Sequence, residues 1–445
     1  MTKPAGSTNL VVIAMDGVSQ TLFWQYREAM PFLWNLYNRS AMFRRFYAAS
    51  TSGLSSFCDF AFGDSTMLDH NRAYPNAPGC LAGGGENLFS LLRRRGYGTL
   101  GLMRASPAPG YAKAGFWGAW PEECGRFQCR EEDGDCRTLV GDFLARNALD
   151  GRPFVLYAGE RAARLDDAHP EKLEEKTFHG RVEKGYALLD RSAKHILDTL
   201  EESGFLANTV VAGFGPYGTD PWKHGVFAGR THAFDPYADL CWTPLFIYRN
   251  GADAGVADQL LSMIDLKPTL MRLLFPDEPG REPASANAGV DVLSYTRKAA
   301  FTQSLFAFER ENAGPSLGLA KSYAITDGDQ RLVVSSDGGI PGEGGMELYY
   351  DPRDPGNTRN FLDFFQIDPD GAMTAFTFQN IVHPHFFMSF KPNLVKSVAE
   401  SYNFMRRQLF LHIKEKERTA AARIPEGAAE NLFPDDMFRR KRRRR

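Results

Sequence analysis

One segment near the start of the chain constrains the fold more than any other. Residues 9–17 read Asn-Leu-Val-Val-Ile-Ala-Met-Asp-Gly, an apolar run that ends at an acid and a glycine. Such a run predicts a strand that is buried on both faces of a sheet. Because open α/β sheets bind their ligands at the carboxyl ends of their strands, Asp16 is predicted to lie at a functional edge.

Strands and helices alternate along the chain that follows. Short apolar runs predict strands at 99–103, 153–157 and 208–213, and apolar residues at helical spacing predict helices at 87–97 and 178–204. The polar, cysteine-containing residues between the first two of these strands are interpreted as an insertion. The alternation predicts a mostly parallel sheet that is covered by helices on both faces.

The composition is that of a globular protein. The chain has 445 residues, of which 43% are hydrophobic, and this is enough to bury a large core. No run approaches the roughly 18 apolar residues that a membrane span requires, and the first residues do not resemble a secretion signal. Six cysteines in a chain of this length do not make a disulfide framework. We therefore expect a soluble, cytoplasmic protein with reduced thiols.

A candidate nucleophile lies in the hydroxyl-rich segment 49–63. This segment reads Ala-Ser-Thr-Ser-Gly-Leu-Ser-Ser-Phe-Cys-Asp-Phe-Ala-Phe-Gly. Small hydroxyl residues around a glycine, followed by an apolar stretch, predict hydroxyls at the N-terminus of a helix. The free amide groups and the helix dipole at such a position favour anions and stabilise an alkoxide. Serine-rich helix caps are also common without any catalytic role, so an ordinary cap is the alternative.

The order of these pieces resembles the sulfatase branch of the alkaline-phosphatase superfamily. The strand that ends at Asp16 is followed by a Met-Pro-Phe-Leu-Trp-Asn-Leu helix at 30–36, like a helix of that family. Trp-Thr-Pro-Leu-Phe-Ile at 242–247 is similar to its Val-Pro-Leu strand. Ile-Asp-Leu-Lys-Pro-Thr-Leu at 264–270 and Glu-Leu-Tyr-Tyr-Asp-Pro at 347–352 also resemble motifs of the family.

This resemblance extends from residue 9 to residue 362 and implies an α/β fold, an alkaline-phosphatase-like α/β/α sandwich with a mixed, mostly parallel sheet. It implies a catalytic-fold domain at 8–275 and a small C-terminal α+β subdomain at 276–365, in which Asp-Gly at 327–328 predicts a hairpin turn. Residues 366–445 go beyond the family pattern. Apolar residues at helical spacing between 394 and 418 predict a helix there, followed by a basic disordered tail.

The resemblance also implies a site for attack on an anionic ester. Asp16 takes the first metal-ligand position, and His232, which precedes the Pro-Leu strand, takes the second. The hydroxyl-rich segment is similar to that of phosphoglycerol and phosphoethanolamine transferases, which places Ser55 at the nucleophile position with Ser52 and Thr51 as alternatives. No arginine follows these hydroxyls in the pattern that formylglycine formation requires, so an unmodified nucleophile is expected.

The loop after the predicted strand at 208–213 departs from the family pattern. Where the family has Ser-Asp-His-Gly, this chain has Gly-Pro-Tyr-Gly, so Pro216 and Tyr217 replace two metal ligands. Proline cannot bind a metal, and a neutral tyrosine is a poor ligand. Three residues further along the chain are the candidate replacements: Asp220, Lys223 and His224. The ordinary reading of such a loop is a tight turn.

Two hypotheses of function follow. The first is a hydrolase or transferase that acts on a phosphate ester, less readily on a sulfate ester, through Ser55 and a divalent metal ion such as Ca, Mg, Mn or Zn. Arg230 or Lys223 would offset the charge of a small anionic substrate. The second is a catalytically impaired protein that keeps the fold for a binding or scaffolding role. Asp16 and His232 favour the first hypothesis, whereas the Pro-Tyr replacement favours the second.

The C-terminus is strongly basic. All seven residues at 439–445 are Lys or Arg, although the whole chain has 52 basic residues against 54 acidic ones. Consecutive cations cannot enter a core without partners, so this segment is expected to be mobile. Attachment to an anionic membrane surface is the favoured role, because each basic residue near such a surface contributes about 1 kcal/mol. Nucleic acid is the second candidate partner, and a solvated end is the plain alternative.

Truncation tests the role of this tail. We expect the full chain to co-sediment with anionic liposomes at low salt, and a chain that ends at Phe438 to lose most of this binding because seven positive charges are removed. Retention of duplex DNA or RNA, measured at the same salt concentrations, separates a nucleic-acid partner from a membrane. Equal binding by the full and truncated chains would show that the tail is only a solvated end.

Overall fold

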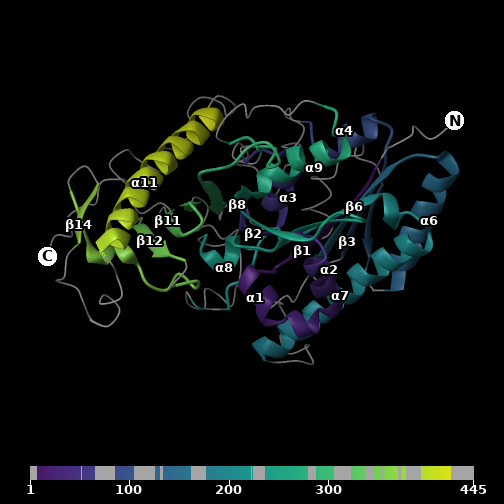
Figure 1. Ribbon diagram of the computed structural model, residues 1–445, viewed down its shortest axis with the longest axis horizontal. Helices are drawn as coiled ribbons and strands as arrows, with labels where there is room; N and C mark the ends of the chain where they lie inside the picture. The colour runs from purple at the N-terminus through teal and green to yellow at the C-terminus, as the bar shows by residue number, and fades with distance from the viewer. Residues whose placement is uncertain are drawn as a thin grey trace.

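A computed structural model describes most of the elements expected from the sequence (Figure 1). The described residues are 8–51, 53–65, 86–104, 126–130, 134–161, 177–221, 223, 236–278, 287–304, 322–335, 345–351, 354–368, 372–376 and 392–421.

The main domain is built on a sheet of eight strands. Strand β1 lies inside this sheet, and its neighbours β5 and β6 are both parallel to it. Strand β7 is antiparallel to both of its neighbours, β6 and β2, and the other pairs are parallel. The sheet is therefore mixed and mostly parallel, as predicted. In spatial order its strands are β4 (Arg126–Arg130), β3 (Gly98–Arg104), β5 (Phe154–Arg161), β1 (Asn9–Asp16), β6 (Thr209–Phe214), β7 (Leu245–Arg249), β2 (Ala41–Tyr47) and β8 (Gly255–Ser262).

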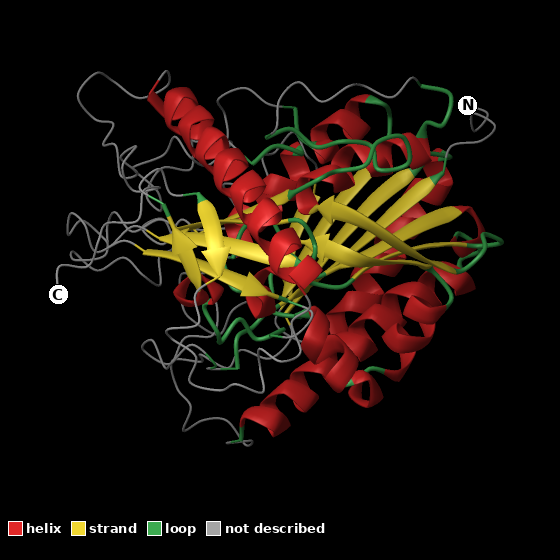
Figure 2. Ribbon diagram, turned by 60° about the vertical axis from the view of Figure 1, so that its left-hand side comes forward, coloured by secondary structure: helices red, strands yellow, loops and turns green. Residues whose placement is uncertain are grey.

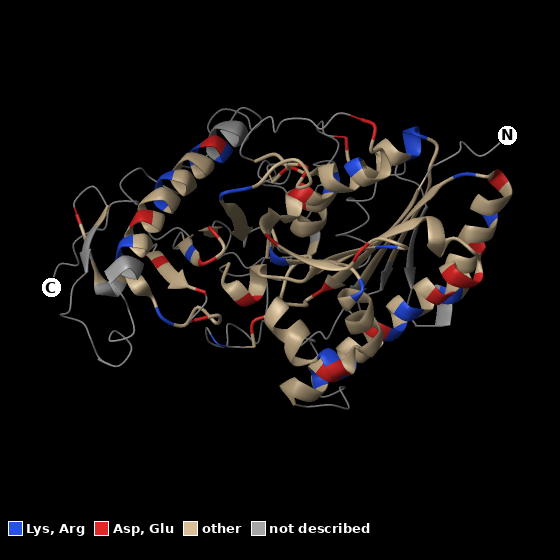
Figure 3. Cartoon of the chain, viewed as in Figure 1, with Lys and Arg blue, Asp and Glu red and all other residues tan. Residues whose placement is uncertain are grey.

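Helices cover both faces of this sheet (Figure 2). One face carries α1 (Gln20–Gln25), α2 (Pro31–Asn38), α6 (Gly134–Asp150) and α7 (Phe178–Glu202). The other face carries α3 (Gly53–Phe62), α4 (Leu88–Arg94) and α9 (Leu266–Leu274). Figure 3 shows many charged residues along α6 and α7, whereas the central strands carry few. The layers form the α/β/α sandwich that the sequence predicts.

The alternation of side chains along β1 explains how one strand serves both layers. Leu10, Val12 and Ala14 belong to the hydrophobic cluster on the α3 side, whereas Val11, Ile13 and Met15 belong to the cluster on the α7 side. Successive side chains of a strand point to opposite faces, so an uninterrupted apolar run is what a strand between two helical layers needs. Asp16 continues the series that faces α3.

Helix α7 shows how a helix in these layers is specified locally. It begins after Thr177, whose side chain accepts a hydrogen bond from the backbone N–H of Gly180 at 3.1 Å and thereby caps the first turn. Its buried residues recur at helical spacing and face the sheet. Gly204, with φ +74°, follows the last turn, where only glycine adopts a left-handed conformation without strain.

The C-terminal region contains a second, smaller sheet. Its antiparallel strands are, in spatial order, β12 (Gly345–Tyr350), β11 (Gln330–Ser335), β10 (Ser322–Thr326) and β9 (Ala300–Ser304). The predicted hairpin is confirmed, because β10 and β11 pair across a turn that contains Gly328 at φ +98°. The predicted boundaries at residues 275 and 365 stay predictions.

Helix α11 (Pro392–Ala421) packs on this sheet, as Figure 1 shows. Tyr402, Met405 and Leu409 are fully buried in one cluster with Ile325 and Leu332. The predicted helical spacing near the C-terminus is therefore confirmed, and the apolar face of the helix covers its own sheet. A hairpin of β13 (Phe365–Ile367) and β14 (Met373–Phe376) adds to the same cluster.

The polar stretch interpreted as an insertion contains regular structure. It forms β4 at the edge of the main sheet and α6, which packs against α7. The apolar stripe of α6 is narrow, with Val140, Phe143 and Leu144 buried and most other described positions exposed. A weak stripe on a peripheral helix is hard to recognise, because tertiary packing supplies most of the stability of such a helix. Across the described helices, no segment combines the length and the apolar character needed to cross a bilayer.

Candidate functional site

The candidate site begins at the carboxyl end of β1. Asp16 is the last residue of this strand and is only 5% exposed. The strand lies between β5 and β6, both of which run parallel to it and end at the same edge. The predicted place of Asp16, at the carboxyl end of a central strand, is therefore confirmed, while its roles in function and as a metal ligand stay predictions.

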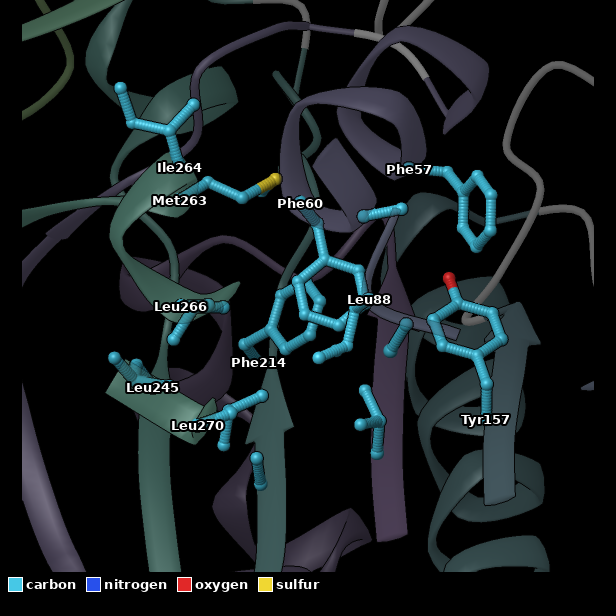
Figure 4. Packing of buried hydrophobic residues seen from close by; sticks show 14 of the residues in the cluster. Phe57, Phe60, Leu88, Tyr157, Phe214, Leu245, Met263, Ile264, Leu266 and Leu270 are labelled. Atoms are coloured by element: carbon cyan, nitrogen blue, oxygen red, sulfur yellow. The ribbon is translucent and has the colours of Figure 1, made fainter. Parts of the chain in front are cut away.

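Tyr157 on β5 packs against helix α3. Its ring lies 5.2 Å from that of Phe57 on α3 in an edge-to-face contact, and Figure 4 shows its hydroxyl directed toward this helix. Burial raises the pKa of Tyr157 well above its usual value, and the neighbouring charges of Asp16 and Cys58 raise it further. Tyr157 belongs to the hydrophobic cluster on the α3 side of the sheet, the face that Asp16 continues at the end of β1.

The hydroxyl residues that precede and begin α3 are all buried where they are described. Two of them are used to hold the segment together: Ser56 Oγ donates to the carbonyl oxygen of Ser50 at 3.1 Å, and Ser50 Oγ donates to the carboxylate of Asp59. Ser55, in the first turn of α3, is 3% exposed and Thr51 is 2% exposed. Of the three predicted candidates for the nucleophile, Ser55 and Thr51 are described, whereas Ser52 lies outside the described residues.

The loop after β6 is packed too tightly to accept larger residues at its glycines. A Cβ atom on Gly218 would lie 2.0 Å from the carbonyl oxygen of Asp239, and one on Gly215 would lie 2.5 Å from that of Val18. Backbone hydrogen bonds from Gly215 to Pro244 at 2.9 Å and from Gly218 to Leu240 at 2.8 Å fix the same loop. Pro216 and Tyr217, between these glycines, are both buried in this loop.

Three charged residues gather beyond this turn. The Lys223 ammonium lies 2.5 Å from Asp239 Oδ2, and the Lys223 backbone N–H donates to Asp220 Oδ1 at 2.7 Å. Burial raises the pKa of Asp239, the charge of Lys223 opposes this shift, and Asp220 adds to it. Lys223, predicted to bind substrate, is thus engaged in an ion pair with a carboxylate that is 1% exposed.

Asp239 was not among the residues that the sequence singled out. It lies in α8 (Ala238–Cys241), directly before the Trp-Thr-Pro-Leu stretch at 242–245. The one signal in the sequence that could have identified Asp239 is its position a few residues before the Pro-Leu strand. Its partner could not be identified from sequence because Lys223 is 16 residues away along the chain.

The described carboxylates do not by themselves make a metal site. Within the described ranges, no group of three or more His, Cys, Asp or Glu side chains is arranged to hold a metal ion. Of the four predicted ligands, Asp16 and Asp220 are described, whereas His224 and His232 lie outside the described residues, as does Arg230. The donors seen are oxygen atoms alone, one of which, Asp220 Oδ1, already accepts a backbone N–H.

Solved structures with the same architecture come from sulfatases and their relatives. A 2-O glycosaminoglycan sulfatase aligns with 94% of this chain and 94% of its own chain at 14% identity, with a TM-score of 0.61. A protein of the alkaline-phosphatase superfamily from Vibrio parahaemolyticus aligns over 80% of this chain and 86% of its own, at 14% identity and a TM-score of 0.54.

A third similar structure is the lipoteichoic acid synthase LtaP from Listeria monocytogenes. It aligns over 75% of this chain and 86% of its own, at 14% identity and a TM-score of 0.53. By sequence, no protein-family model and no curated protein matches the chain. The strand order, the acid at the end of β1 and these structural alignments together show that the protein has the alkaline-phosphatase-like fold of the sulfatases and their relatives.

Proposed function

We propose that this protein is a hydrolase or transferase that acts on a phosphate ester, and less readily on a sulfate ester, with a hydroxyl of the α3 segment as its nucleophile. The observation that carries this proposal is that Asp16 ends a central strand at the carboxyl edge of the main sheet, on the face that α3 and its hydroxyl residues cover. Structural relatives that act as sulfatases or as a lipoteichoic acid synthase support this class of chemistry.

The chemistry would proceed through a covalent intermediate. An oxygen of the α3 segment forms a bond to phosphorus while the bond from phosphorus to the ester oxygen breaks, and the alcohol leaves with a proton. Water then cleaves the enzyme ester in a hydrolase, whereas an acceptor alcohol does so in a transferase. Ser55 lies in the first turn of α3, where the helix dipole stabilises the negative charge that develops on the nucleophile and the phosphoryl group.

A divalent cation would strengthen this site by neutralising the ester oxygens. Asp16 would hold it together with His232 and with Asp220 or His224, but the described donors alone do not complete such a site. In this proposal Ser55 supplies the attacking oxygen, and Arg230 or Lys223 would offset the charge of the substrate.

A second candidate function, binding without turnover, rests on a specific observation. Pro216 and Tyr217 stand where the family pattern has metal ligands, and Lys223, the described residue predicted to offset substrate charge, is paired with Asp239. A cationic side chain neutralised in this way attracts an anionic substrate less strongly. A protein with these features would keep the pocket of the fold for recognition alone.

Metal analysis and turnover separate the two functions. We expect the purified full chain to contain a divalent cation and to hydrolyse an aryl phosphate faster than an aryl sulfate. Asp16→Asn should lower both the metal content and the rate, because it removes the anionic ligand at the end of β1. A wild-type protein without metal and without turnover, and with no difference from the variant, would contradict the catalytic proposal and favour binding.

A further inference from the structure

A buried lysine on the C-terminal helix contacts the segment around the candidate nucleophile. Lys416, near the end of α11, is 2% exposed and donates to the carbonyl oxygen of Ser65 at 2.6 Å. It also donates to the side-chain oxygen of Gln303 on β9. Ser65 follows α3 in the chain, so Lys416, 351 residues later, contacts the region just after the helix that contains Ser55.

Gln303 links the two ends of the α3 segment. Its side-chain amide donates to Ser50 Oγ at 3.4 Å, before the helix, and to the carbonyl oxygen of Ser65 at 3.2 Å, after it. Its backbone N–H donates to Ala49 at 2.8 Å, and its backbone carbonyl accepts from Thr51 at 3.2 Å. Gln303 therefore contacts the residues just before and just after α3, the helix that contains Ser55.

The same contacts continue into α3. Ser50, which accepts from Gln303, donates to the carboxylate of Asp59, and Asp59 is 1% exposed on α3. The chain of contacts thus runs from Lys416 through Gln303 and Ser50 to Asp59. A buried polar chain of this kind costs free energy unless its members remain paired, so each contact restricts the positions of its neighbours.

The surroundings of Lys416 fix the end of α11 on the small sheet. The imidazole of His412, one turn earlier, stacks on Phe301 of β9 with ring centroids 4.0 Å apart. Burial lowers the pKa of His412 well below its usual value, and the charges of Lys416 and Arg297 add to this effect. His412 is therefore neutral at pH 7.

We propose that Lys416 is a positioning residue for the hydroxyl segment, acting through Gln303 to hold Ser50 and Ser65 at the two ends of α3. This inference rests on the proposed function for its catalytic consequence, because the segment that is held contains the nucleophile. Small displacements of a reacting group from its productive position are costly in rate, so the effect would be expressed in kcat.

Hydrogen exchange of the full-length protein tests the structural part. We expect Lys416→Met to speed amide exchange in peptides from residues 48–65 and to leave peptides from residues 9–16 unchanged. The matched control is Lys396→Met on the same helix, because Lys396 is 78% exposed and pairs only with a neighbouring glutamate through a 3.7 Å contact in the described structure. Identical exchange at 48–65 in Lys416→Met and wild type would overturn the proposal. If Lys416→Met does not fold, Lys416→Gln, which retains a shorter hydrogen-bond donor, takes its place.

Steady-state kinetics test the catalytic part on an aryl phosphate. A wild type with turnover should lose about tenfold or more in kcat on Lys416→Met, with KM changed much less, since the substrate-binding groups remain. Gln303→Met should likewise lower kcat with little change in KM, and Lys396→Met should have the kcat and KM of the wild type. An unchanged kcat in an active protein would overturn the proposal. If the wild type has no turnover, the proposed function fails, whereas the exchange measurement still decides whether Lys416 holds the segment.

Discussion

Replacing Ser55 with alanine is expected to lower kcat for an aryl phosphate by about 10³-fold or more, because the alanine variant has no oxygen that can form the enzyme ester. Ser55 lies in the first turn of α3, on the face of the sheet to which Asp16 also belongs. KM should change little if Ser55 contributes to the transition state and not to ground-state binding.

The neighbouring hydroxyls supply the controls for this experiment. Ser56→Ala removes a hydroxyl that donates to the Ser50 carbonyl oxygen and should therefore alter stability more than it alters chemistry. Thr51→Val and Ser52→Ala test the two alternative nucleophiles directly. A full loss of turnover in one of these two variants, with activity retained in Ser55→Ala, would assign the nucleophile to that residue and would refute the choice of Ser55.

Replacing Asp265 with alanine is expected to lower the free energy of unfolding by about 3–5 kcal/mol, the usual cost of breaking a buried ion pair from one side. Asp265 is fully buried, and Arg297, 9% exposed, donates to it through Nε and Nη2 at 2.6–2.8 Å. It also accepts the backbone N–H groups of Ser262 and Val290, each at 2.8 Å. Its loss leaves a buried guanidinium and two backbone donors without their acceptor.

Denaturant unfolding measures this effect, with two variants as comparisons. Asp198→Ala breaks the pair with Lys194 on the surface of α7, and this change should cost less than about 1 kcal/mol because both groups are solvated. Arg297→Met should approach the effect of Asp265→Ala, since it leaves the carboxylate buried and unpaired. A value for Asp265→Ala no larger than that for Asp198→Ala would show that the Asp265–Arg297 pair contributes little to stability.

Asp265 belongs to one of the motifs on which the family resemblance depended. This motif is Ile-Asp-Leu-Lys-Pro-Thr-Leu at 264–270. In the structure its acid lies directly before α9 and ties the chain at 288–297 to the main domain, where Arg297 also donates to the carbonyl oxygen of Ala288 at 2.7 Å. The motif is therefore structural, and its resemblance to the family reports the fold more directly than the chemistry.

The sequence by itself determined the architecture of the main domain. The apolar run ending at Asp16 predicted a doubly buried strand, and the stripe of α7 predicted a long helix, because side-chain periodicity follows from the geometry of each element. The predicted strands at 99–103, 153–157 and 208–213 were confirmed as β3, β5 and β6. Elements whose burial is one-sided or peripheral, such as β4 and α6, left a weaker pattern and were not predicted.

Only the tertiary structure decided which residues act together. The pairing of Lys223 with Asp239, the contact of Tyr157 with Phe57 on α3, and the contact of Lys416 with Gln303 join residues between 16 and 113 positions apart in the chain. Local periodicity carries no information about such pairs, because an ion pair or a buried hydrogen bond depends on where distant segments meet and not on their spacing in the chain. Sequence patterns identified Asp16 and the hydroxyl segment as candidates. Only the packing of the helical layers on the main sheet, and the contacts from β9 and α11, showed how these residues are held in place.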